Sequence, residues 1–305
     1  MIKWENARMK QKTFDAFLIM VIPAFLLFFT FHTFPALQSL FYSFTNWRGY
    51  GIYKFVGLKN YLNVFADARV WEAYLFTFKF AITATLLVNI LSLLLAMALN
   101  STIPLRRIFR AIYFFPNILS ILIIGFIFRY MFVYLFPQAG AWFVNAFHLG
   151  QPFAVLTENI LGKPNLAWLG IVAVVTWQGI AFNTLLYLAG LQTVPDELFE
   201  AASLDGAGKI SRFWHITLPI IMPFVTINMV LAMKGFLMVF DPIMALTGGG
   251  PGRATEAIAL VIYRGGFQGG QFAYQSANAI LYFIIILLVS LFQIKVLQKR
   301  EVSIA

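Results

Sequence analysis

The sequence contains no cysteine and few charged residues. Asp, Glu, Lys and Arg make up 11% of its 305 residues, whereas about a quarter of an average soluble domain is charged. The absence of cysteine excludes a disulfide framework and a thiolate metal site. The shortage of charge, together with 61% hydrophobic residues, excludes an ordinary soluble protein.

Several signals of chemistry are missing as well. The chain has no Gly-x-x-x-x-Gly-Lys-[Ser/Thr] run, which excludes a P-loop nucleotide site of its own. His32, His148 and His215 are scattered without a second ligand at metal spacing, so we assign no metal. No serine, histidine and carboxylate share a helix face in a way that indicates hydrolysis. The net charge of +10 requires no nucleic acid, because basic residues beside membrane spans meet anionic lipid.

Long apolar stretches dominate what is present. A helix needs ~20 apolar residues to cross a bilayer, and backbone groups in hydrocarbon must be satisfied within the helix. Alternation of period two, the mark of a membrane barrel, is absent. We therefore predict an all-α integral membrane protein with six transmembrane helices. The six predicted spans lie near residues 16–36, 73–99, 109–135, 167–191, 218–240 and 274–297.

Lys and Arg in the connections set the orientation. Twelve of them lie in residues 1–15, in the links at 100–110 and 192–217, and after residue 294, against seven in the longer links of the other side. Both termini and the 192–217 loop are therefore predicted to be cytoplasmic. The predicted divisions are an N-terminal segment with the first span and an outer interfacial segment (1–72), a core (73–297) and a tail (298–305).

Two aromatic segments are predicted to form helices at the outer interface, where Trp and Tyr are favoured. They are Phe55–Tyr61 and Ala141–Leu149. Thr247–Gly252 predicts a turn on the same side. Lys234 and Asp241 stand seven residues apart, a spacing that permits an ion pair on one helix face.

The cytoplasmic loop carries helix signals. Thr193 is predicted to cap a helix whose first turn contains Pro195 and Asp196, because an acidic residue complements the positive helix end. The helix is predicted to end near Leu204, followed by a turn at Gly206 and a second short helix. Periodicity alone favours an ordinary connector between two spans.

A longer motif changes this interpretation. Glu200-Ala201-Ala202 is followed after three residues by Gly206, and after nine more by Ile216-x-Leu218-Pro219. This spacing resembles the signature loop of the membrane subunits of bacterial ATP-binding-cassette (ABC) importers.

Three further segments resemble the carbohydrate-uptake branch of that family, namely Phe55–Tyr61, Leu191–Pro195 and Thr247–Pro251. Among its two permease subunits the chain is similar to the first, the type related to glycerol-phosphate and maltose permeases, and the resemblance covers nearly the whole chain. Maltose-type members can carry extra N-terminal spans and a large outer insertion, and this chain has neither.

The resemblance implies a type I ABC importer permease fold and a set of partners. They are a second homologous permease subunit, two copies of a cytoplasmic ATPase, and an extracytoplasmic solute-binding protein, assembled at the bacterial inner membrane. ATP and Mg would bind to the ATPase, so this chain needs no cofactor and catalyses no covalent chemistry. The residues implied in ATPase coupling are Glu200, Ala201, Ala202, Asp205, Gly206, Ile216, Leu218 and Pro219.

Polar groups within spans are candidates for a substrate path. In the fourth span, Thr176, Gly179, Asn183 and Tyr187 recur on one helix stripe. Hydroxyl, amide and aromatic groups suit a sugar, but helix–helix packing explains such a stripe equally well.

The fifth span adds Asn228, Lys234 and Phe236 as path candidates. The fourth and fifth spans line the pocket in related permeases, which implies Gln178, Phe182 and Phe236 by position. The asparagine-rich stretch of the maltose-type fifth span is absent, so its sugar contacts cannot be transferred to this chain.

We therefore expect the membrane permease subunit of an ATP-driven, binding-protein-dependent importer of a sugar, and specifically of an oligosaccharide. The alternatives within the family are a polyol or a glycerol-phosphate-type solute, and an amino acid or a metal. Outside the family, an ion-coupled secondary carrier predicts a mid-membrane carboxylate and inverted repeats, and a membrane-embedded enzyme predicts a catalytic constellation. The sequence displays neither of these features.

Overall fold

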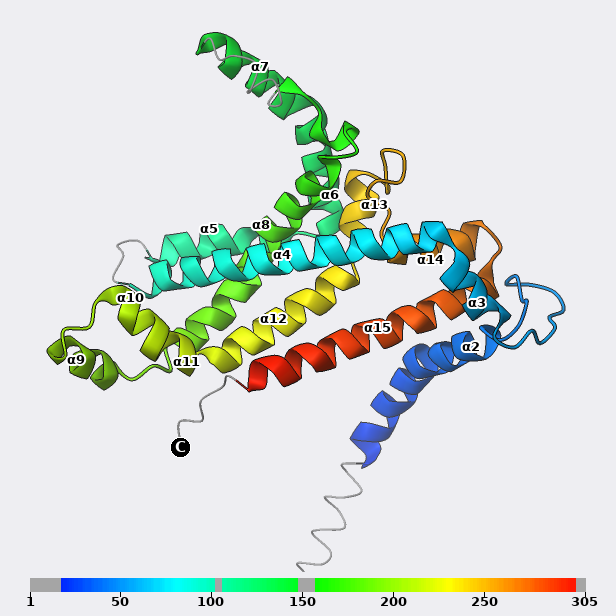
Figure 1. The fold of residues 1–305 in the computed structure, drawn as a ribbon, viewed down its shortest axis with the longest axis horizontal. Helices are drawn as coiled ribbons and strands as arrows, with labels where there is room; N and C mark the ends of the chain where they lie inside the picture. The colour runs from blue at the N-terminus through cyan, green and yellow to red at the C-terminus, as the bar shows by residue number, and fades with distance from the viewer. Residues whose placement is uncertain (1–17, 102–105, 148–156, 300–305) are drawn as a thin grey trace, which may run out of the picture. The chain divides into compact units, whose positions relative to one another are not determined.

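The computed structural model describes residues 18–101, 106–147 and 157–299 (Figure 1). The basic N-terminal segment, the first residues of the predicted first span and most of the predicted tail lie outside these residues. Helices account for nearly all regular structure in the described part, as predicted. The chain divides into two compact units, residues 1–66 with 262–282 and residues 67–261 with 283–305.

The first unit contains the first apolar helix, Leu18–Tyr42, which includes a π-helical turn. Polar contacts hold the segment that follows this helix. The buried amide of Asn60 donates to the carbonyls of Ser43 (2.8 Å) and Thr45 (2.7 Å). The predicted interfacial helix at 55–61 is wrong in its bounds: the helix runs from Lys59 to Ala66, and Phe55 pairs with Thr45 in an isolated β-bridge instead. The elements are η1 (Phe29–Thr33), α2 (Phe34–Tyr42), α3 (Lys59–Ala66) and η6 (Arg264–Gln268).

The second unit holds most of the helices, and two helices run from one unit into the other. The second unit contains α4 (Ala68–Asn100), α5 (Arg106–Ile118), α6 (Ile121–Tyr130), η2 (Met131–Leu135), α7 (Phe136–Ala146), η4 (Ile160–Gly162), α8 (Ala167–Leu191), α9 (Asp196–Leu204), α10 (Lys209–Arg212), η5 (Phe213–Thr217), α11 (Leu218–Ile220), α12 (Met222–Leu237) and α13 (Asp241–Leu246). The helices shared between the units are α14 (Ile258–Tyr263) and α15 (Phe272–Gln298).

The core of the second unit lies where α4 packs against α8 and α12. Alanines at the contact, such as Ala84 and Ala181, are fully buried and allow the helices to approach closely. Phe80 and Ile171 fill the space between them. Because many outward side chains on these helices are apolar and exposed, such as Leu86 and Leu185, this surface suits lipid or a protein partner rather than water.

Five described helices are long and apolar enough to span a membrane, or six if one bent pair counts as a single span. The fourth predicted span, 167–191, has the same bounds as α8. The predicted fifth span is bent by 71° between α11 and α12. Pro219 and Pro223 flank the break at Ile221, and each removes one backbone donor from the helical ladder.

The third predicted span, 109–135, is wrong in its bounds. The helix stops after Ile118, and Ser120 takes an extended backbone as the N-cap of α6. The spanning helix is instead Ile121–Ala146. It absorbs most of the predicted interfacial helix at 141–149, whose last two residues are not described. Pro116 lies one turn before the break, and hydropathy alone does not detect such a break.

An ion pair joins two distant parts of the second unit. Arg69, in the first turn of α4, contacts Glu256 through two hydrogen bonds of 2.7 and 2.9 Å. Glu256 is buried, and the paired guanidinium compensates its charge. The hydroxyl of Thr77 nearby accepts a hydrogen bond from the backbone N–H of Ile258 (3.0 Å). These contacts hold α4 against the segment that leads into α14.

Gly125 sets the distance between α6 and α13. A Cβ built on Gly125 would overlap the Cβ of Ala245. We expect Gly125→Ala to destabilise the protein by about 1–3 kcal/mol, the usual cost of overpacking. Ala245→Gly in the same chain should restore most of that loss, because it removes the opposing methyl group. Thermal unfolding of the four variants in detergent tests this, and equal melting temperatures for Gly125→Ala and the parent would contradict it.

Candidate functional site

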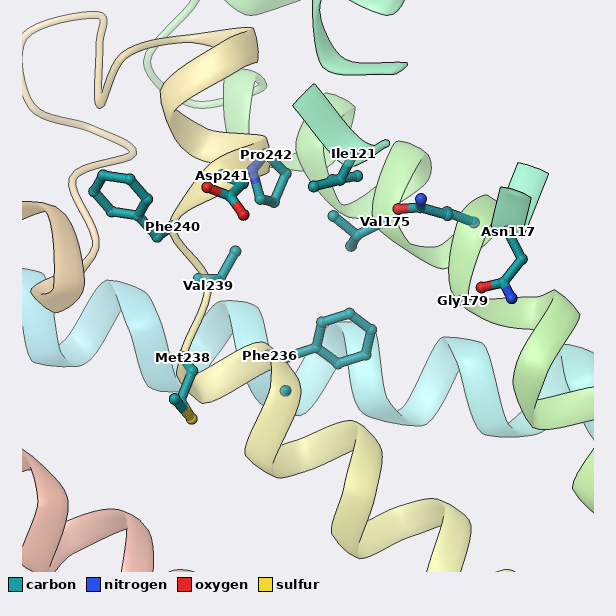
Figure 2. Close-up of a pocket in the computed structure, with 12 residues that line it drawn as sticks. Asn117, Ile121, Val175, Gly179, Phe236, Met238, Val239, Phe240, Asp241 and Pro242 are labelled. Atoms are coloured by element: carbon teal, nitrogen blue, oxygen red, sulfur yellow. The ribbon is translucent and has the colours of Figure 1, made fainter. Parts of the chain in front are cut away.

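A cavity of 490 Å³ lies within the second unit, between the middle of α8 and the ends of α5, α6, α12 and α13 (Figure 2). The side chains of Asp241 and Asn117 stand on opposite sides of this space, and the ring of Phe236 lies between them at its lower edge in this view. The lining residues are Asn117, Ile121, Val175, Gln178, Gly179, Gly235, Phe236, Met238, Val239, Phe240, Asp241 and Pro242.

The cavity lies where two helical paths are interrupted. The break between α5 and α6 falls at Leu119–Ser120, and the break between α12 and α13 falls at Met238–Phe240. Non-helical backbone at membrane depth is tolerated where it is buried in protein or lines a cavity. Gln178 donates a hydrogen bond of 3.1 Å to the carbonyl of Leu119, which satisfies one acceptor freed by the first break. Both breaks thus contribute to the wall of this cavity.

The lining combines hydrogen-bonding groups with aromatic rings. Asn117 and Gln178 supply amides, Asp241 supplies a carboxylate, and Phe236 and Phe240 supply rings. Amides and carboxylates can bond to hydroxyl groups, and ring faces can pack against C–H groups. In chemical terms the arrangement can bind a hydroxylated, partly apolar solute. No group here is arranged as a nucleophile with an adjacent base.

Gln178, Gly179 and Phe236 are the predicted path residues that the structure brings together at the cavity. Phe236 packs edge-to-face against the buried ring of Phe80, with centroids 6.3 Å apart. Three other predicted path residues lie away from the lining: Thr176 is buried, and Phe182 and Lys234 are exposed.

Asn183, Tyr187 and Asn228 lie instead in a buried polar network between α4, α8 and α12. The hydroxyl of Tyr187 donates to the side-chain oxygen of Asn89 at 2.6 Å. The amide of Asn228 donates to the backbone carbonyl of Asn183 at 3.3 Å. Tyr187 is 1% exposed, and Asn228 is fully buried. In this conformation the three residues connect helices, as the packing interpretation of the stripe expects.

Two polar residues of the cavity lining, Asn117 and Asp241, have only weak signals in the sequence. Asn117 is a weak candidate from sequence, and its signal is an amide that follows Pro116 within an apolar run. The predicted ion pair of Lys234 with Asp241 is not found among the described residues. Because α12 ends at Leu237, Asp241 begins a new helix and does not share a face with Lys234. The signal for Asp241 in the sequence is the pair Asp241-Pro242, which is typical of a helix start.

The predicted loop helices are present. The predicted helix that ends near Leu204 is present as α9, but its predicted start is wrong. Pro195 is the N-cap rather than a residue of the first turn, and Thr193 instead donates to Gly190 O at 2.7 Å and thereby closes α8. Gly206 has a φ of +74°, which a side chain would disfavour. The N–H groups of Gly206 and Ala207 donate to Ser203 O (3.1 Å) and Ala202 O (2.9 Å), which is a Schellman C-cap.

The segment from α9 to α11, here called the elbow (residues 196–220), presents one anchored and one exposed part. Ile216 packs with the buried cluster at the ends of α4 and α8, and Leu218 and Pro219 are half-buried. Glu200, Ala201 and Asp205 are exposed and Ala202 is half-buried. Leu204 and Ile210 are 91% and 77% exposed, respectively. Exposed apolar side chains on a polar, capped elbow indicate a surface that another protein covers.

The same two helices connect the elbow to the cavity. α8 passes the cavity at Gly179 and reaches α9 four residues after its own end. α12 begins directly after the elbow and ends at the cavity, with Phe236 in its last turn. Figure 1 shows α9 and α10 at the left of α12 and α13 at its right. A displacement of the elbow would therefore act on both walls of the cavity.

Comparison with known proteins gives a consistent result. Residues 88–302 match the model of a family described as the binding-protein-dependent transport system inner membrane component. The multiple sugar-binding transport system permease protein MsmF of Streptococcus mutans is 40% identical over 275 residues, which cover 89% of this chain and 91% of that protein. The probable starch degradation products transport system permease protein AmyD of Thermoanaerobacterium thermosulfurigenes is 33% identical, with coverage of 88% and 89%.

A solved structure shows the same fold. The structure is that of a bacterial ABC transporter involved in the import of the acidic polysaccharide alginate, and one of its chains aligns with a TM-score of 0.78 at 20% identity. The alignment covers 96% of this chain and 99% of that chain. The predicted resemblance to carbohydrate-uptake ABC permeases is confirmed by the family match and by the two relatives. The chain belongs to the family of binding-protein-dependent transport system inner membrane components, and it is a multi-pass membrane permease subunit of the ABC type.

Proposed function

We propose that this chain forms half of the translocation path of an ATP-driven importer of oligosaccharides. The observation that supports this most directly is the connection of the cavity to the elbow through α8 and α12. A protein that only conducts a solute needs no such elbow, and a protein that only binds a cytoplasmic partner needs no cavity between its apolar helices. Their combination suits a subunit in which an external motor changes the shape of a solute site.

The motor in this proposal is a pair of cytoplasmic ATPase subunits that bind ATP and Mg. The exposed side of α9, with Glu200 and Ala201, would enter a cleft on one ATPase, and Leu204 would be covered there. Gly206 would hold the angle between α9 and α10. The elbow would then lie on the cytoplasmic side together with both termini, in agreement with the distribution of Lys and Arg.

The cargo is argued from the lining and from the relatives. Two amides, one carboxylate and two phenyl rings suit a sugar, which offers hydroxyl groups at its edge and C–H groups on its faces. The two relatives carry names that refer to multiple sugars and to starch degradation products. A polyol or a glycerol-phosphate-type solute is the alternative cargo.

The remaining partners follow from the same proposal. A second permease subunit would close the path along the exposed apolar faces, and a solute-binding protein would deliver the sugar from the outer side. A second solved structure supports the latter partner by analogy. It is a bacterial alginate ABC transporter in complex with an alginate pentasaccharide-bound periplasmic protein, and the matching chain aligns with a TM-score of 0.76.

The coupling role predicts that two glycine substitutions differ. Gly206→Asp places a side chain where φ is +74°, which strains the elbow, whereas Gly208→Asp puts the same charge at the N-cap of α10, where aspartate is favoured. In the purified complex together with its solute-binding protein, we expect Gly206→Asp to reduce substrate-stimulated ATP hydrolysis at least about tenfold, the equivalent of ~1.4 kcal/mol in coupling, and Gly208→Asp to retain it. Full stimulation in Gly206→Asp would rule out the elbow as the joint.

The path assignment predicts opposite effects for a lining residue and a network residue. Asn117→Ala removes one hydrogen bond to the solute, worth about 0.5–1.5 kcal/mol, so the KM for maltotriose uptake should rise about two- to tenfold without a change in melting temperature. Tyr187→Phe leaves the buried oxygen of Asn89 without its 2.6 Å donor, at a cost of about 1–3 kcal/mol in stability.

Uptake and thermal unfolding, measured on the same preparations, separate the two effects. Tyr187→Phe should melt earlier and keep its KM. A raised KM in Tyr187→Phe at unchanged stability would instead place Tyr187 in the solute path.

A further inference from the structure

We propose that Asp241 makes the cavity selective against anionic solutes. This inference rests on the proposed function, because it concerns what the same cavity admits. Asp241 is the first residue of α13, and its side chain is exposed on the wall of the cavity opposite Asn117 (Figure 2). Among the described residues around the cavity, Asp241 is the only one with a formal charge at neutral pH.

Nothing in the described part of the chain neutralises this carboxylate with an ion pair. The two ion pairs found there join Arg69 to Glu256 and Lys163 to Glu158. The closest basic residue along the sequence is Lys234, in the last turn of α12, and it does not line the cavity. The negative potential of Asp241 therefore acts within the space that a solute would enter.

The surroundings strengthen this effect. A concave site with low-dielectric walls focuses the field of a charge that lines it. Phe236, Phe240 and Val239 provide such walls, because their side chains are apolar. A phosphate or uronate group that enters the cavity meets a like charge, and the repulsion is larger there than at an open surface.

The same carboxylate favours a neutral sugar. A carboxylate only accepts hydrogen bonds, and a bond from a hydroxyl group to an ionised acceptor is stronger than one between neutral groups. Asp241 therefore attracts hydroxylated neutral solutes and rejects acidic ones, and specificity arises from both contributions. Among the cargo alternatives, this favours neutral oligosaccharides and polyols over glycerol phosphate.

The absence of cysteine permits a direct measurement of this potential. Met238→Cys places a thiol on the cavity wall, at a position where the native side chain is 56% exposed. In the purified complex with cysteine-free partners, its rates of reaction with a cationic and an anionic methanethiosulfonate are compared. With Asp241 present, the cation-to-anion rate ratio should be about three- to tenfold higher than with Asp241→Asn, as expected for one charge on the wall of the same cavity.

Ser101→Cys provides the matched control, because Ser101 is exposed at the C-cap of α4, outside the elbow, and lies about 20 Å along α4 from Val88, which packs against Gly179 at the cavity. Adding Asp241→Asn should leave the rate ratio of this control unchanged. If Met238→Cys gave the same ratio with and without Asp241→Asn, the proposal would be overturned. A change of equal size in the Ser101→Cys control would overturn it too, because the effect would then not be local.

Protection of the thiol at position 238 from a neutral methanethiosulfonate tests solute selection. Maltotriose should protect the thiol at a lower concentration than its aldonic acid, which carries one terminal carboxylate. Asp241→Asn should reduce the ratio of these two protecting concentrations at least about threefold. An unchanged difference would overturn the selective role of Asp241. If neither sugar protects, the proposed sugar path fails, while the two reagent ratios still decide whether Asp241 controls the potential.

Discussion

Hydrocarbon offers a peptide group no hydrogen-bond partner, so every interruption of a membrane helix must find its partners within the protein. The structure meets this requirement at the break between α5 and α6, where Gln178 of α8 donates to the carbonyl of Leu119. The break between α12 and α13 opens onto the same cavity. Two interruptions that would each be costly in lipid are grouped around one space, and this grouping defines the candidate solute site.

The rest of the second unit stabilises that space. α4 supplies a long straight wall against which α8 and α12 pack, and the buried pair of Tyr187 and Asn89 fixes α8 to α4 below the cavity. At the opposite end, the ion pair of Arg69 with Glu256 ties α4 to the segment before α14. These polar contacts each join one defined pair of segments, and helices that are apolar on several sides depend on such contacts for a unique alignment.

Much of the helical fold is predictable from the sequence, and the reason is visible in α8. Its predicted bounds of 167–191 match the structure, because hydropathy measures the length of an apolar helix directly. The turn at Gly206 is also predictable, since an Asp-Gly pair after a helix indicates a left-handed residue. Apolar length and local turn chemistry are properties of short segments, so a single sequence contains them.

The breaks and the partner of each polar group depend on other segments. Hydropathy predicts one span at 109–135, whereas the structure has a break at Ser120. Hydropathy misses the break because it measures only how apolar a window is, and not that Pro116 lacks a backbone N–H. A helical wheel places Gly179 and Tyr187 on one stripe, but the first faces the cavity and the second faces Asn89. Which neighbour a polar side chain meets is decided by packing, and one sequence alone does not show that choice.

Because of the 71° bend at Ile221, α12 can act as a lever that turns about the end of the elbow. Its 16 residues are hydrogen-bonded as one rigid rod of about 24 Å, interrupted at both ends. If the elbow turned this rod by about five degrees around Ile221, the ring of Phe236 at its far end would travel about 2 Å, by the length and rise of the helix. A displacement of that size is comparable to the width of a hydroxyl group. A small rotation of α12 at the elbow is therefore enough to change the contacts between Phe236 and a solute in the cavity.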